Sequence, residues 1–400
     1  MKALVYIGEF KELHKGKSLA LLERKINVKF QVERDVLAEA VAWAARTLPT
    51  RPAQPMLAGL LIEADKNSLT LSAFDYEVSS RVSVDAGISE GGKVLVSGKL
   101  FADISRSLPN QPVTGSINGS RLELKCGRSV FALPTLPPDD YPQLPPLPKT
   151  SGSVKAKTFS ESVAQVAVAA GRDDALPMLT GIRVEIEGNT ITLAATDRYR
   201  LAVKEFNWNP NDPKISTAAL VPARTLAEGA KGFLNSSEVL IALASDNDRL
   251  MGFEGEGRRT TTRLLDAEFP KYRSLLPSES SSTADVSTQE LLDALKRVEL
   301  VAERNTPIRL DFKKNELILR AGTGEEATAE EVIGLTLEGE GLEIAFNAAY
   351  LKDGLASVNA PTTRLSFTAA SKPAVLSGVN SDGVNDESYR YLIMPVRLAG

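Results

Sequence analysis

One stretch of the chain occurs twice, and this internal repeat constrains the fold more than any other feature. Pro55–Asp75 (PMLAGLLIEADKNSLTLSAFD) aligns without a gap with Pro177–Asp197 (PMLTGIRVEIEGNTITLAATD). Each copy has the pattern of a strand, a tight turn, a second strand with alternating apolar and polar residues, and a further turn at the aspartate. The repeat therefore predicts one hairpin unit that recurs along the chain.

A helix with one apolar spacing is predicted ahead of each hairpin, and again in a third copy. Its apolar residues follow one another at steps of four, three and four, which places them on one helical face. A later segment, Asn315–Gly322, has the pattern of the second strand of a third hairpin. The helical sets are Leu37, Val41, Ala44 and Leu48, then Phe159, Val163, Val166 and Ala170, and finally Leu291, Leu295, Val298 and Ala302.

The second half of the unit also occurs three times, as a short apolar strand that leads into a helix. Ser97 and Asn347 are suitable N-caps for two of these helices, and Pro222 suits the start of the other. Each domain is therefore predicted to have two helices and roughly eight strands, and since the helices need antiparallel sheets to lie on, the fold class is α+β. The segments are Val94–Ile104, Ala219–Gly229 and Ile344–Gly354.

Proline-rich and serine-rich stretches separate the copies. Leu133–Gly152 has too many prolines for a helix or a central strand, and Leu264–Ser282 ends the second copy. We predict three domains, at residues 27–147, 150–277 and 283–400. Residues 1–26 have no counterpart in any copy and are predicted to be an N-terminal extension of unknown role.

Composition excludes several classes of protein. No apolar run approaches the roughly 18 residues of a membrane-spanning helix, and the charged N-terminus lacks the core of a signal peptide. The single cysteine, Cys126, excludes an internal disulfide, and the single histidine, His14, leaves no His or Cys cluster for a metal. We expect a cytoplasmic protein without cofactors. The net charge of −4 argues only weakly against a nucleic-acid partner.

Sequence signals for catalysis are weak. Gly87–Val94 satisfies G-x-x-x-x-G-K, but Val94 replaces the Ser or Thr that would bind magnesium, and a strand follows, which favours a hairpin turn. The pairs Asp139-Asp140 and Asp173-Asp174 are better interpreted as solvated turn residues than as acid/base groups. The chain has no G-x-S-x-G and no histidine to serve as a base. We therefore expect a protein that is not an enzyme.

The turn of the second copy has a sequence of its own. Ala194–Val203 (AATDRYRLAV) shares with the first copy the aspartate and little else. Two interpretations stay open on the residues alone. In one, Asp197 caps backbone N–H groups in an ordinary turn with two exposed arginines; in the other, Arg200 and Leu201 form the lip of a groove.

Three segments together resemble one protein family. Residues 172–203 (RDDALPMLTGIRVEIEGNTITLAATDRYRLAV), 260–277 (TTTRLLDAEFPKYRSLLP) and 391–400 (YLIMPVRLAG) are similar to the bacterial DNA polymerase III beta subunit, the sliding clamp. The likeness is greatest to the high-G+C Gram-positive (actinobacterial) form and runs from about Ile26 to Gly400. It implies a head-to-tail homodimer whose domains close a ring around duplex DNA, with helices lining the hole and sheets outside.

A ring of this kind holds DNA by topology, so weak phosphate contacts suffice, and a net acidic protein can have a modestly basic inner surface. Each candidate taken alone is explained equally well as a solvated surface residue, and the hypothesis concerns their sum. The candidates lie on or beside the repeated helices and are Arg51, Lys99, Arg106, Arg172, Arg224, Lys231, Lys296 and Arg304.

The resemblance also implies two protein interfaces. The dimer contact carries over to the strand Arg128–Leu133, where Phe131 and Leu133 point outward from one face, and to Leu300 and Val301; core packing explains these residues almost as well. A groove between domains two and three binds peptides of the polymerase alpha subunit, the clamp loader, and repair and translesion polymerases. Its residues carry over to Leu179, Thr196, Arg200, Leu201, Pro270, Arg273, Leu275, Leu392, Met394, Pro395, Val396 and Arg397.

We thus expect a non-enzymatic, nucleoid-associated clamp that encircles double-stranded DNA, tethers polymerase to it and has no membrane partner. One alternative is a specialised paralogue, for example one that confers tolerance of a clamp-binding inhibitor. Others are a DNA-processing enzyme that uses the turn carboxylates, and a repeat scaffold without DNA. At the C-terminus, Met394–Arg397 are interpreted as a groove wall, whereas for Leu392 and Ile393 completion of a core stays an alternative.

Overall fold

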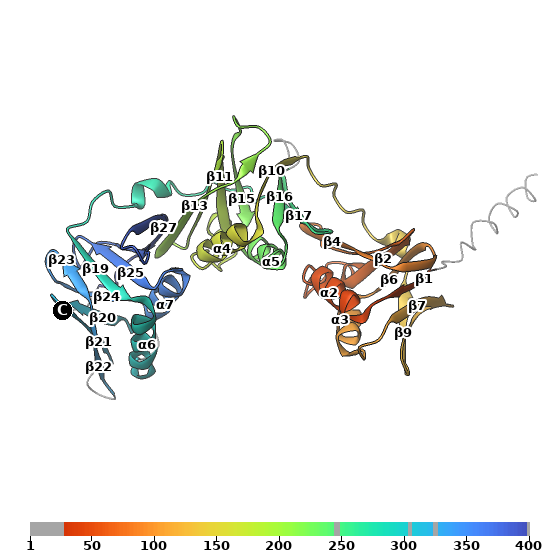
Figure 1. The fold of residues 1–400 in the computed structure, drawn as a ribbon, viewed down its shortest axis with the longest axis horizontal. Helices are drawn as coiled ribbons and strands as arrows, with labels where there is room; N and C mark the ends of the chain where they lie inside the picture. The colour runs from red at the N-terminus through yellow and green to blue at the C-terminus, as the bar shows by residue number, and fades with distance from the viewer. Residues whose placement is uncertain (1–27, 244–248, 303–305, 323–326, 398–400) are drawn as a thin grey trace, which may run out of the picture. The chain divides into compact units, whose positions relative to one another are not determined.

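The computed structural model describes residues 28–243, 249–302, 306–322 and 327–397. The chain divides into two compact units, Met1–Pro145 and Pro146–Gly400 (Figure 1). Within the described residues each copy of the repeat has two α-helices, as the sequence predicts, and the two pack against each other. The pairs are α2 (Arg34–Ala45) with α3 (Gly98–Ser107), α4 (Ala156–Ala167) with α5 (Ala223–Gly232), and α6 (Thr288–Val298) with α7 (Ala348–Ser357).

The first unit carries an antiparallel sheet in the order β4-β3-β2-β6-β9-β8-β7-β1-β5. Helix α2 lies against β3 and β4 and buries Leu37 and Val41 completely. The strands are β1 (Lys29–Val32), β2 (Gly59–Asp65), β3 (Ser68–Phe74), β4 (Val78–Asp85), β5 (Gly87–Glu90), β6 (Gly92–Ser97), β7 (Val113–Asn118), β8 (Arg121–Cys126) and β9 (Ser129–Leu136).

The second unit holds the other two copies, which we call the central part (β10 to β18) and the C-terminal part (β19 to β27). The central strands are β10 (Thr150–Lys155), β11 (Gly181–Glu187), β12 (Thr190–Thr196), β13 (Arg200–Asn207), β14 (Asn209–Pro210), β15 (Ser216–Pro222), β16 (Glu238–Leu243), β17 (Leu250–Gly255) and β18 (Arg258–Arg263). The C-terminal strands are β19 (Ser282–Ser287), β20 (Ile308–Phe312), β21 (Glu316–Ala321), β22 (Ala329–Gly334), β23 (Thr336–Glu338), β24 (Glu343–Phe346), β25 (Thr362–Phe367), β26 (Ala374–Val379) and β27 (Asn385–Ile393).

One sheet crosses from the central part to the C-terminal part. Its order is β15-β11-β12-β13-β27-β26-β25-β19-β23, and the crossing is the antiparallel pair β13–β27. Leu201 lies directly opposite Leu392 in this pair, and both belong to a hydrophobic cluster with Phe269 and Tyr272. The two parts therefore share backbone hydrogen bonds and a core. Shorter sheets, β14-β10-β16-β17-β18 and β22-β21-β20-β24, complete the unit.

The predicted repeat is confirmed down to backbone conformation. Pro55–Ala58 and Pro177–Leu179 both form 3₁₀ turns, and β2–β3 and β11–β12 are the two hairpins. Both hairpin turns need a residue in the left-handed region, with φ of 50° at Lys66 and 55° at Gly188. Glycine adopts that conformation without a steric cost, whereas lysine does so at some cost in energy.

The predicted helical faces are confirmed for the residues that lie on the helices. The first three apolar residues of each set are at most 2% exposed, whereas Leu48 and Ala302 follow the helices and are half-buried. Asn347 caps α7 by accepting a hydrogen bond from the Tyr350 N–H at 3.1 Å. Ser97 occupies the N-cap position of α3 but makes no side-chain cap bond.

One expectation needs correction. Gly87–Val94 is not a hairpin, because β5 pairs with β1 and β6 pairs with β2, so the segment connects separate places in the sheet. As the sequence indicates, a strand and not a helix follows its lysine. The described residues give each copy nine strands (β1–β9, β10–β18 and β19–β27), which agrees with the roughly eight expected. Some are short, such as β14, which has two residues.

Among the residues that the structure describes, no helix is both long and apolar enough to cross a bilayer.

Candidate functional site

A cavity of ≈ 700 Å³ opens between the central and C-terminal parts of the second unit. Its central wall comes from the segment after α4 and from the turn between β12 and β13, and its other wall comes from α7. The lining combines apolar side chains, a pair of tyrosines and charges of both signs. It consists of Ala170, Gly171, Arg172, Asp173, Leu176, Leu179, Asp197, Arg198, Tyr199, Arg200, Ala349, Tyr350 and Asp353.

The turn at Asp197 has the geometry that a capping aspartate predicts. Asp197 Oδ1 accepts hydrogen bonds from the N–H groups of Tyr199 (3.0 Å) and Arg200 (3.1 Å). Asp75 makes the same pair of bonds in the first copy, to the N–H groups of Glu77 and Val78. In both turns the next residue has a positive φ, 79° at Arg198 in the second copy. The aspartate therefore has a structural role in both copies.

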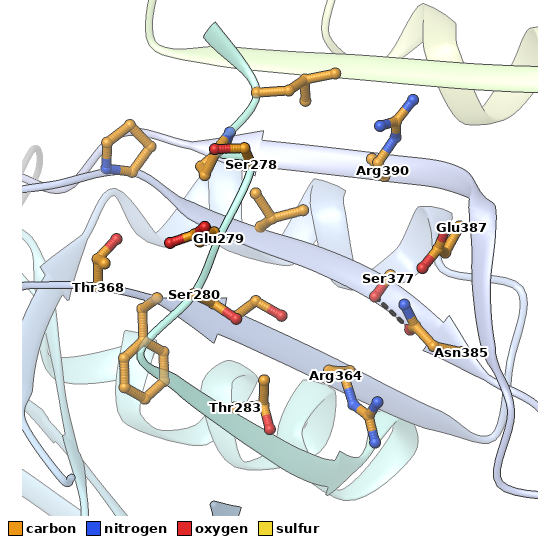
Figure 2. A pocket seen from close by; sticks show the side chains of 16 residues that line it. Ser278, Glu279, Ser280, Thr283, Arg364, Thr368, Ser377, Asn385, Glu387 and Arg390 are labelled. Carbon is orange, nitrogen blue, oxygen red and sulfur yellow. Dashed lines mark hydrogen bonds between the residues drawn. The ribbon is translucent and has the colours of Figure 1, made fainter. Parts of the chain in front are cut away.

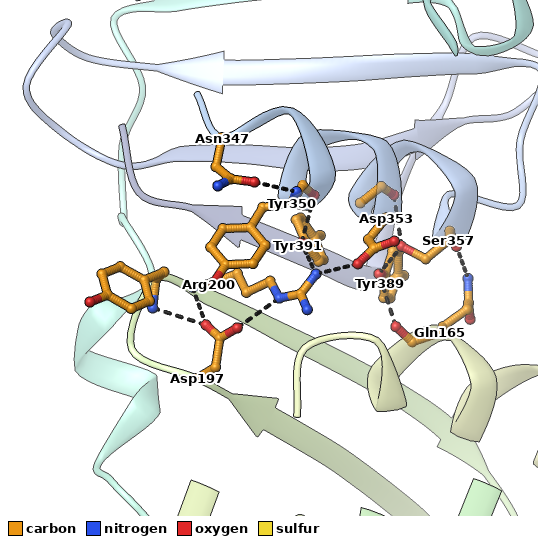
Figure 3. A network of polar contacts seen from close by, with 11 residues as sticks. Gln165, Asp197, Arg200, Asn347, Tyr350, Asp353, Ser357, Tyr389 and Tyr391 are labelled. Atoms are coloured by element: carbon orange, nitrogen blue, oxygen red, sulfur yellow. Dashed lines mark hydrogen bonds and ion pairs between the residues drawn. The ribbon is translucent and has the colours of Figure 1, made fainter. Parts of the chain in front are cut away.

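Arg200 is where the two copies differ, and neither interpretation of the turn anticipates its environment. The residue is 5% exposed, so only Arg198 of the two arginines is exposed. Its Nε donates to Asp197 Oδ2 at 2.9 Å, and its Nη1 donates to Asp353 Oδ2 at 2.6 Å and to the Tyr391 hydroxyl at 3.4 Å (Figure 3). The guanidinium also lies 4.4 Å from the ring centroid of Tyr350.

These neighbours keep the guanidinium charged. Burial alone would lower the pKa of Arg200, but the oxygens of Tyr391, Asp353 and Asp197 outweigh burial, so its pKa is raised. Burial raises the pKa of the Tyr391 hydroxyl, which therefore stays neutral at physiological pH. The site holds one buried cation between two carboxylates, which is the pairing that a buried charge requires.

A neutral polar network continues from this cluster along the junction of the two parts. The Tyr389 hydroxyl and Ser357 Oγ are 2.6 Å apart, and the same hydroxyl donates to the backbone oxygen of Gln165 (Figure 3). Gln165 Nε2 in turn donates to the Ser357 carbonyl at 3.0 Å. Helix α4 is thereby tied to α7 and β27 by polar groups that are satisfied inside the junction.

The predicted groove residues fall into two groups. Leu179, Thr196, Leu201 and Leu392 are buried, together with Arg200, and Thr196 Oγ1 donates to the Arg200 carbonyl at 2.7 Å. Pro270 and Pro395 are half-buried, and Arg273 and Arg397 are exposed. Three large apolar side chains stay exposed: Leu275 (51%), Met394 (40%) and Val396 (38%). An exposed apolar set next to buried leucines suits an extended peptide better than a small charged ligand.

The segment that carries Pro270, Arg273 and Leu275 is attached to β11 through one carboxylate. Glu185 Oε2 accepts from the Tyr272 hydroxyl at 2.9 Å and from Arg273 Nη2 at 2.6 Å. Burial alone would raise the pKa of Glu185, but the hydrogen bonds from Arg273 and Tyr272 outweigh it, and the pKa is lowered. Arg273 therefore helps to fix the position of the 3₁₀ turn η4 (Tyr272–Leu275).

The chain segment that follows η4 lines a second cavity, of ≈ 460 Å³, together with residues of β25, β26 and β27 (Figure 2). Ser278, Glu279 and Ser280 lie along one side of it, and Arg364 and Arg390 contribute from the strands. Both arginines already have acidic partners, Asp285 for Arg364 and Glu205 for Arg390. The lining is mixed in charge, and no single ligand class is favoured there.

The candidate DNA-facing residues are exposed wherever the structure describes them. Lys99 and Arg106 lie on α3, Arg224 and Lys231 on α5, and Lys296 on α6. Two of the seven have acidic neighbours, because Arg224 pairs with Glu228 and Lys296 with Asp293. Arg51 and Arg172 follow α2 and α4, and Arg172 also lines the 700 Å³ cavity. Arg304 and the extension 1–26 lie outside the described residues.

The candidate dimer residues stay predictions, but the outward direction expected for Leu133 is wrong. Leu300 is 84% exposed and Val301 is half-buried in the 3₁₀ turn after α6, so both are accessible. Phe131 is 37% exposed, but Leu133 is 1% exposed and does not point outward. The two face Leu124 and Leu122 of β8, which are fully buried, so their shared face is the core face and Phe131 lies at its rim.

The acidic pairs have the surroundings of turn residues. Asp139 and Asp140 are exposed in a 3₁₀ turn, and Asp173 Oδ1 accepts a hydrogen bond from the Ala175 N–H at 3.0 Å. Over the described ranges, no three His, Cys, Asp or Glu side chains come together as a metal site would require.

Sequence reasoning missed Tyr350, Asp353 and Tyr391, which surround Arg200. A signal was present for two of them, since Tyr350 and Asp353 lie in the third repeat segment, Ile344–Gly354, on successive turns of the helix. Their contact with a residue of the second copy has no local signature.

Three protein-family models match consecutive parts of the chain. They describe the N-terminal, central and C-terminal domains of the DNA polymerase III beta subunit and match residues 28–145, 153–271 and 273–397.

Individual relatives agree with the family models. The chain is 56% identical to the beta sliding clamp of Streptomyces coelicolor, over 93% of this chain and all of that protein. It is 45% identical to the beta sliding clamp homolog GriR of Streptomyces muensis, over 92% of this chain and 99% of that protein. Among solved structures, the DNA polymerase sliding clamp of Bacillus subtilis matches with a TM-score of 0.85 at 25% identity and covers 93% of this chain and all of that one.

Proposed function

The chain belongs to the DNA polymerase III beta subunit family, and we propose that it is a sliding clamp that closes as a homodimeric ring around duplex DNA. The observation that carries the proposal is the match of all three family domains, in order, to one chain. Members of this family are processivity factors without catalytic activity. The chain does no chemistry of its own in this role, and its work is to hold other proteins on DNA.

The DNA-facing surface consists of the candidate basic residues on and beside the repeated helices α2 to α6. Their contribution is electrostatic and independent of DNA sequence, because long flexible lysines and arginines contact phosphates rather than base edges. Pairs such as Arg224 with Glu228 keep the positive charge modest. Weak contacts of this kind let a ring slide while its closure prevents escape. Such a protein works in the cytoplasm, in association with the nucleoid.

The partner-binding surface combines Leu275, Met394 and Val396 with the cavity beside Arg200. Met394 N–H donates to the Tyr199 carbonyl and Val396 N–H to the Ala345 carbonyl, each at 2.8 Å, so the terminal segment is fixed next to the cavity wall. A surface with exposed aliphatic side chains and a flexible methionine suits extended peptides that carry Leu and Phe. The polymerase alpha subunit, the clamp loader, and repair and translesion polymerases would bring such peptides.

A specialised clamp paralogue is the second candidate, and the 45% identity to GriR is the observation that favours it. The 56% identity to the Streptomyces coelicolor clamp supports the general replicative role more strongly.

Complementation tests both candidates. Expressed in an actinobacterial strain whose own clamp can be depleted, the chain should restore growth and normal replication rates. A chain that folds and dimerises but does not support growth would contradict the replicative role. Growth that resists a clamp-binding inhibitor, compared with the host clamp at equal expression, would support the specialised role instead.

A further inference from the structure

The guanidinium of Arg200 is shared by two aspartates from different copies of the repeat. Asp197 belongs to the central part, and Asp353 lies on α7 of the C-terminal part (Figure 3). We propose that Asp353 is a positioning residue: it fixes Arg200 against α7 and thereby sets the two walls of the 700 Å³ cavity in the arrangement that receives a partner peptide. The proposal rests on the proposed function for the identity of the ligand.

The difference in burial between Arg200 and Asp353 shows that Arg200 depends on Asp353 more than Asp353 depends on Arg200. Arg200 is 5% exposed, and a buried guanidinium without a carboxylate is costly, so it needs its acidic partners. The Asp353 side chain is 42% exposed and would be well solvated without Arg200. Without the Asp353 carboxylate, Arg200 would still pair with Asp197, but that partner moves with its own turn and does not hold Arg200 to α7.

The same contact positions the aromatic part of the cavity. Arg200 lies over the ring of Tyr350, and the ring of Tyr199 stacks on Tyr350 with the centroids 6.2 Å apart and the planes at 25°. Tyr350 and Asp353 are three residues apart on α7 and so share a face. The ion pair between Arg200 and Asp353 thus fixes the turn that carries Tyr199 relative to the α7 wall. Tyr199, Arg200, Tyr350 and Asp353 all line the cavity.

Another ion pair across the junction offers a matched control. Lys204 Nζ lies 3.6 Å from Asp386 Oδ2 and donates to Ser388 Oγ at 2.7 Å, so it also joins β13 to β27. The Asp386 side chain is 37% exposed, close to the value for Asp353, but Asp386 does not line the 700 Å³ cavity. Asp386→Asn therefore weakens the junction without changing the contacts of Arg200.

The test compares full-length Asp353→Asn, Asp386→Asn and unchanged protein by two measurements. The first is proton exchange at Arg200 Nη1, the nitrogen that donates to Asp353, by NMR, with the signal identified by its loss in Arg200→Lys. The second is the affinity for a fluorescein-labelled, Leu- and Phe-bearing peptide from the cognate replicative polymerase. We expect Asp353→Asn to speed exchange about tenfold and to weaken the peptide about fivefold, whereas Asp386→Asn changes neither.

Three results would overturn the positioning role. The first is unchanged exchange at Arg200 in Asp353→Asn. The second is a fall in peptide affinity without a change in exchange, which would make Asp353 a direct peptide contact. The third is an equal effect of Asp386→Asn, which would show general loosening of the junction. If the unchanged protein bound no peptide at all, the proposed peptide site would be wrong, and the exchange at Arg200 would still decide whether Asp353 fixes it.

Discussion

At the scale of single residues, the turn between β12 and β13 contains both contacts within a few residues and contacts to distant parts of the chain. The capping role of Asp197 is predictable, because its partners are two and three residues away. The burial of Arg200 is not predictable, because Asp353 and Tyr391 lie 153 and 191 residues further along the chain. Thr196, which the family resemblance assigns to the groove, proves to be bonded inside the turn, since its Oγ1 also accepts from the Arg198 N–H.

Replacing Thr196 tests this structural role. Thr196→Val removes a buried hydroxyl that bonds the Arg200 carbonyl and the Arg198 N–H, and the free energy of unfolding of the second unit should fall by about 1–3 kcal/mol. Thr192→Val is the matched control, because Thr192 is also buried on β12 and makes no side-chain hydrogen bond within the described residues. Equal losses in both variants, measured by chemical denaturation, would contradict the role of the Thr196 hydroxyl.

At the scale of elements, periodicity predicts the helices well and strand partners poorly. The buried faces of α2, α4 and α6 follow from apolar spacing alone, because a helix satisfies its hydrogen bonds internally. A strand depends on partners elsewhere in the chain, and the sequence prediction is therefore wrong in two places. It makes Gly87–Val94 a hairpin turn, although β5 pairs with β1, and it points Leu133 of β9 outward, although this side chain is buried. The pairing of β13 with β27 between copies had no sequence signal either.

The attachment of η4 should depend on pH through Glu185. Because the pKa of the folded-state carboxyl lies below the ordinary value of 4.5, its contribution is fully present above that value and is lost as the pH falls through the lowered pKa. A ¹³C NMR titration of the carboxyl should therefore show a midpoint below 4.5, with the resonances of Tyr272 changing in parallel. Glu185→Gln should give the low-pH resonances of Tyr272 at neutral pH. Resonances of Tyr272 that do not change in either experiment would contradict the attachment.

The role of the last segment of the chain in the peptide groove can be tested by deletion. β27 ends at Ile393, and Leu392 and Ile393 are buried, so both help to complete the core, while the groove role of Leu392 stays a prediction. Deleting residues 394–400 should leave the fold intact but weaken the polymerase peptide by about tenfold or more, because Met394 and Val396 are lost. Val384→Ser, which changes an exposed apolar residue in another turn, should leave affinity unchanged. Unchanged affinity after the deletion would show that the terminal segment does not contribute to peptide binding.

At the scale of the whole molecule, the three copies of the repeat and the family are predictable from the sequence, because each copy repeats its own local pattern. The boundaries at 27–147, 150–277 and 283–400 stay predictions, as do the surfaces that face DNA and the second subunit. These surfaces depend on a partner, and no pattern within one chain records which exposed side chains that partner covers.

The homodimer can be tested at Leu300, the most exposed leucine of the described residues. Leu300 is 84% exposed in the single chain, so Leu300→Asp should not disturb the fold, whereas an unpaired charge in the subunit interface should weaken the dimer by about a hundredfold or more. Analytical ultracentrifugation should then show mainly the 43.0 kDa chain instead of twice that mass. Val384→Asp, at a residue that is 58% exposed, should stay dimeric. A dimeric Leu300→Asp variant would place the interface elsewhere.

The central claim is that the protein stays on DNA by encircling it. The most direct measurement is the lifetime of the complex after the cognate clamp loader has placed the protein on a nicked circular plasmid at high salt, before and after one cut linearises the plasmid. We predict slow release from the circle and rapid loss from the linear DNA, because a ring slides off a free end while salt weakens its phosphate contacts. Equal release from both forms would contradict encirclement.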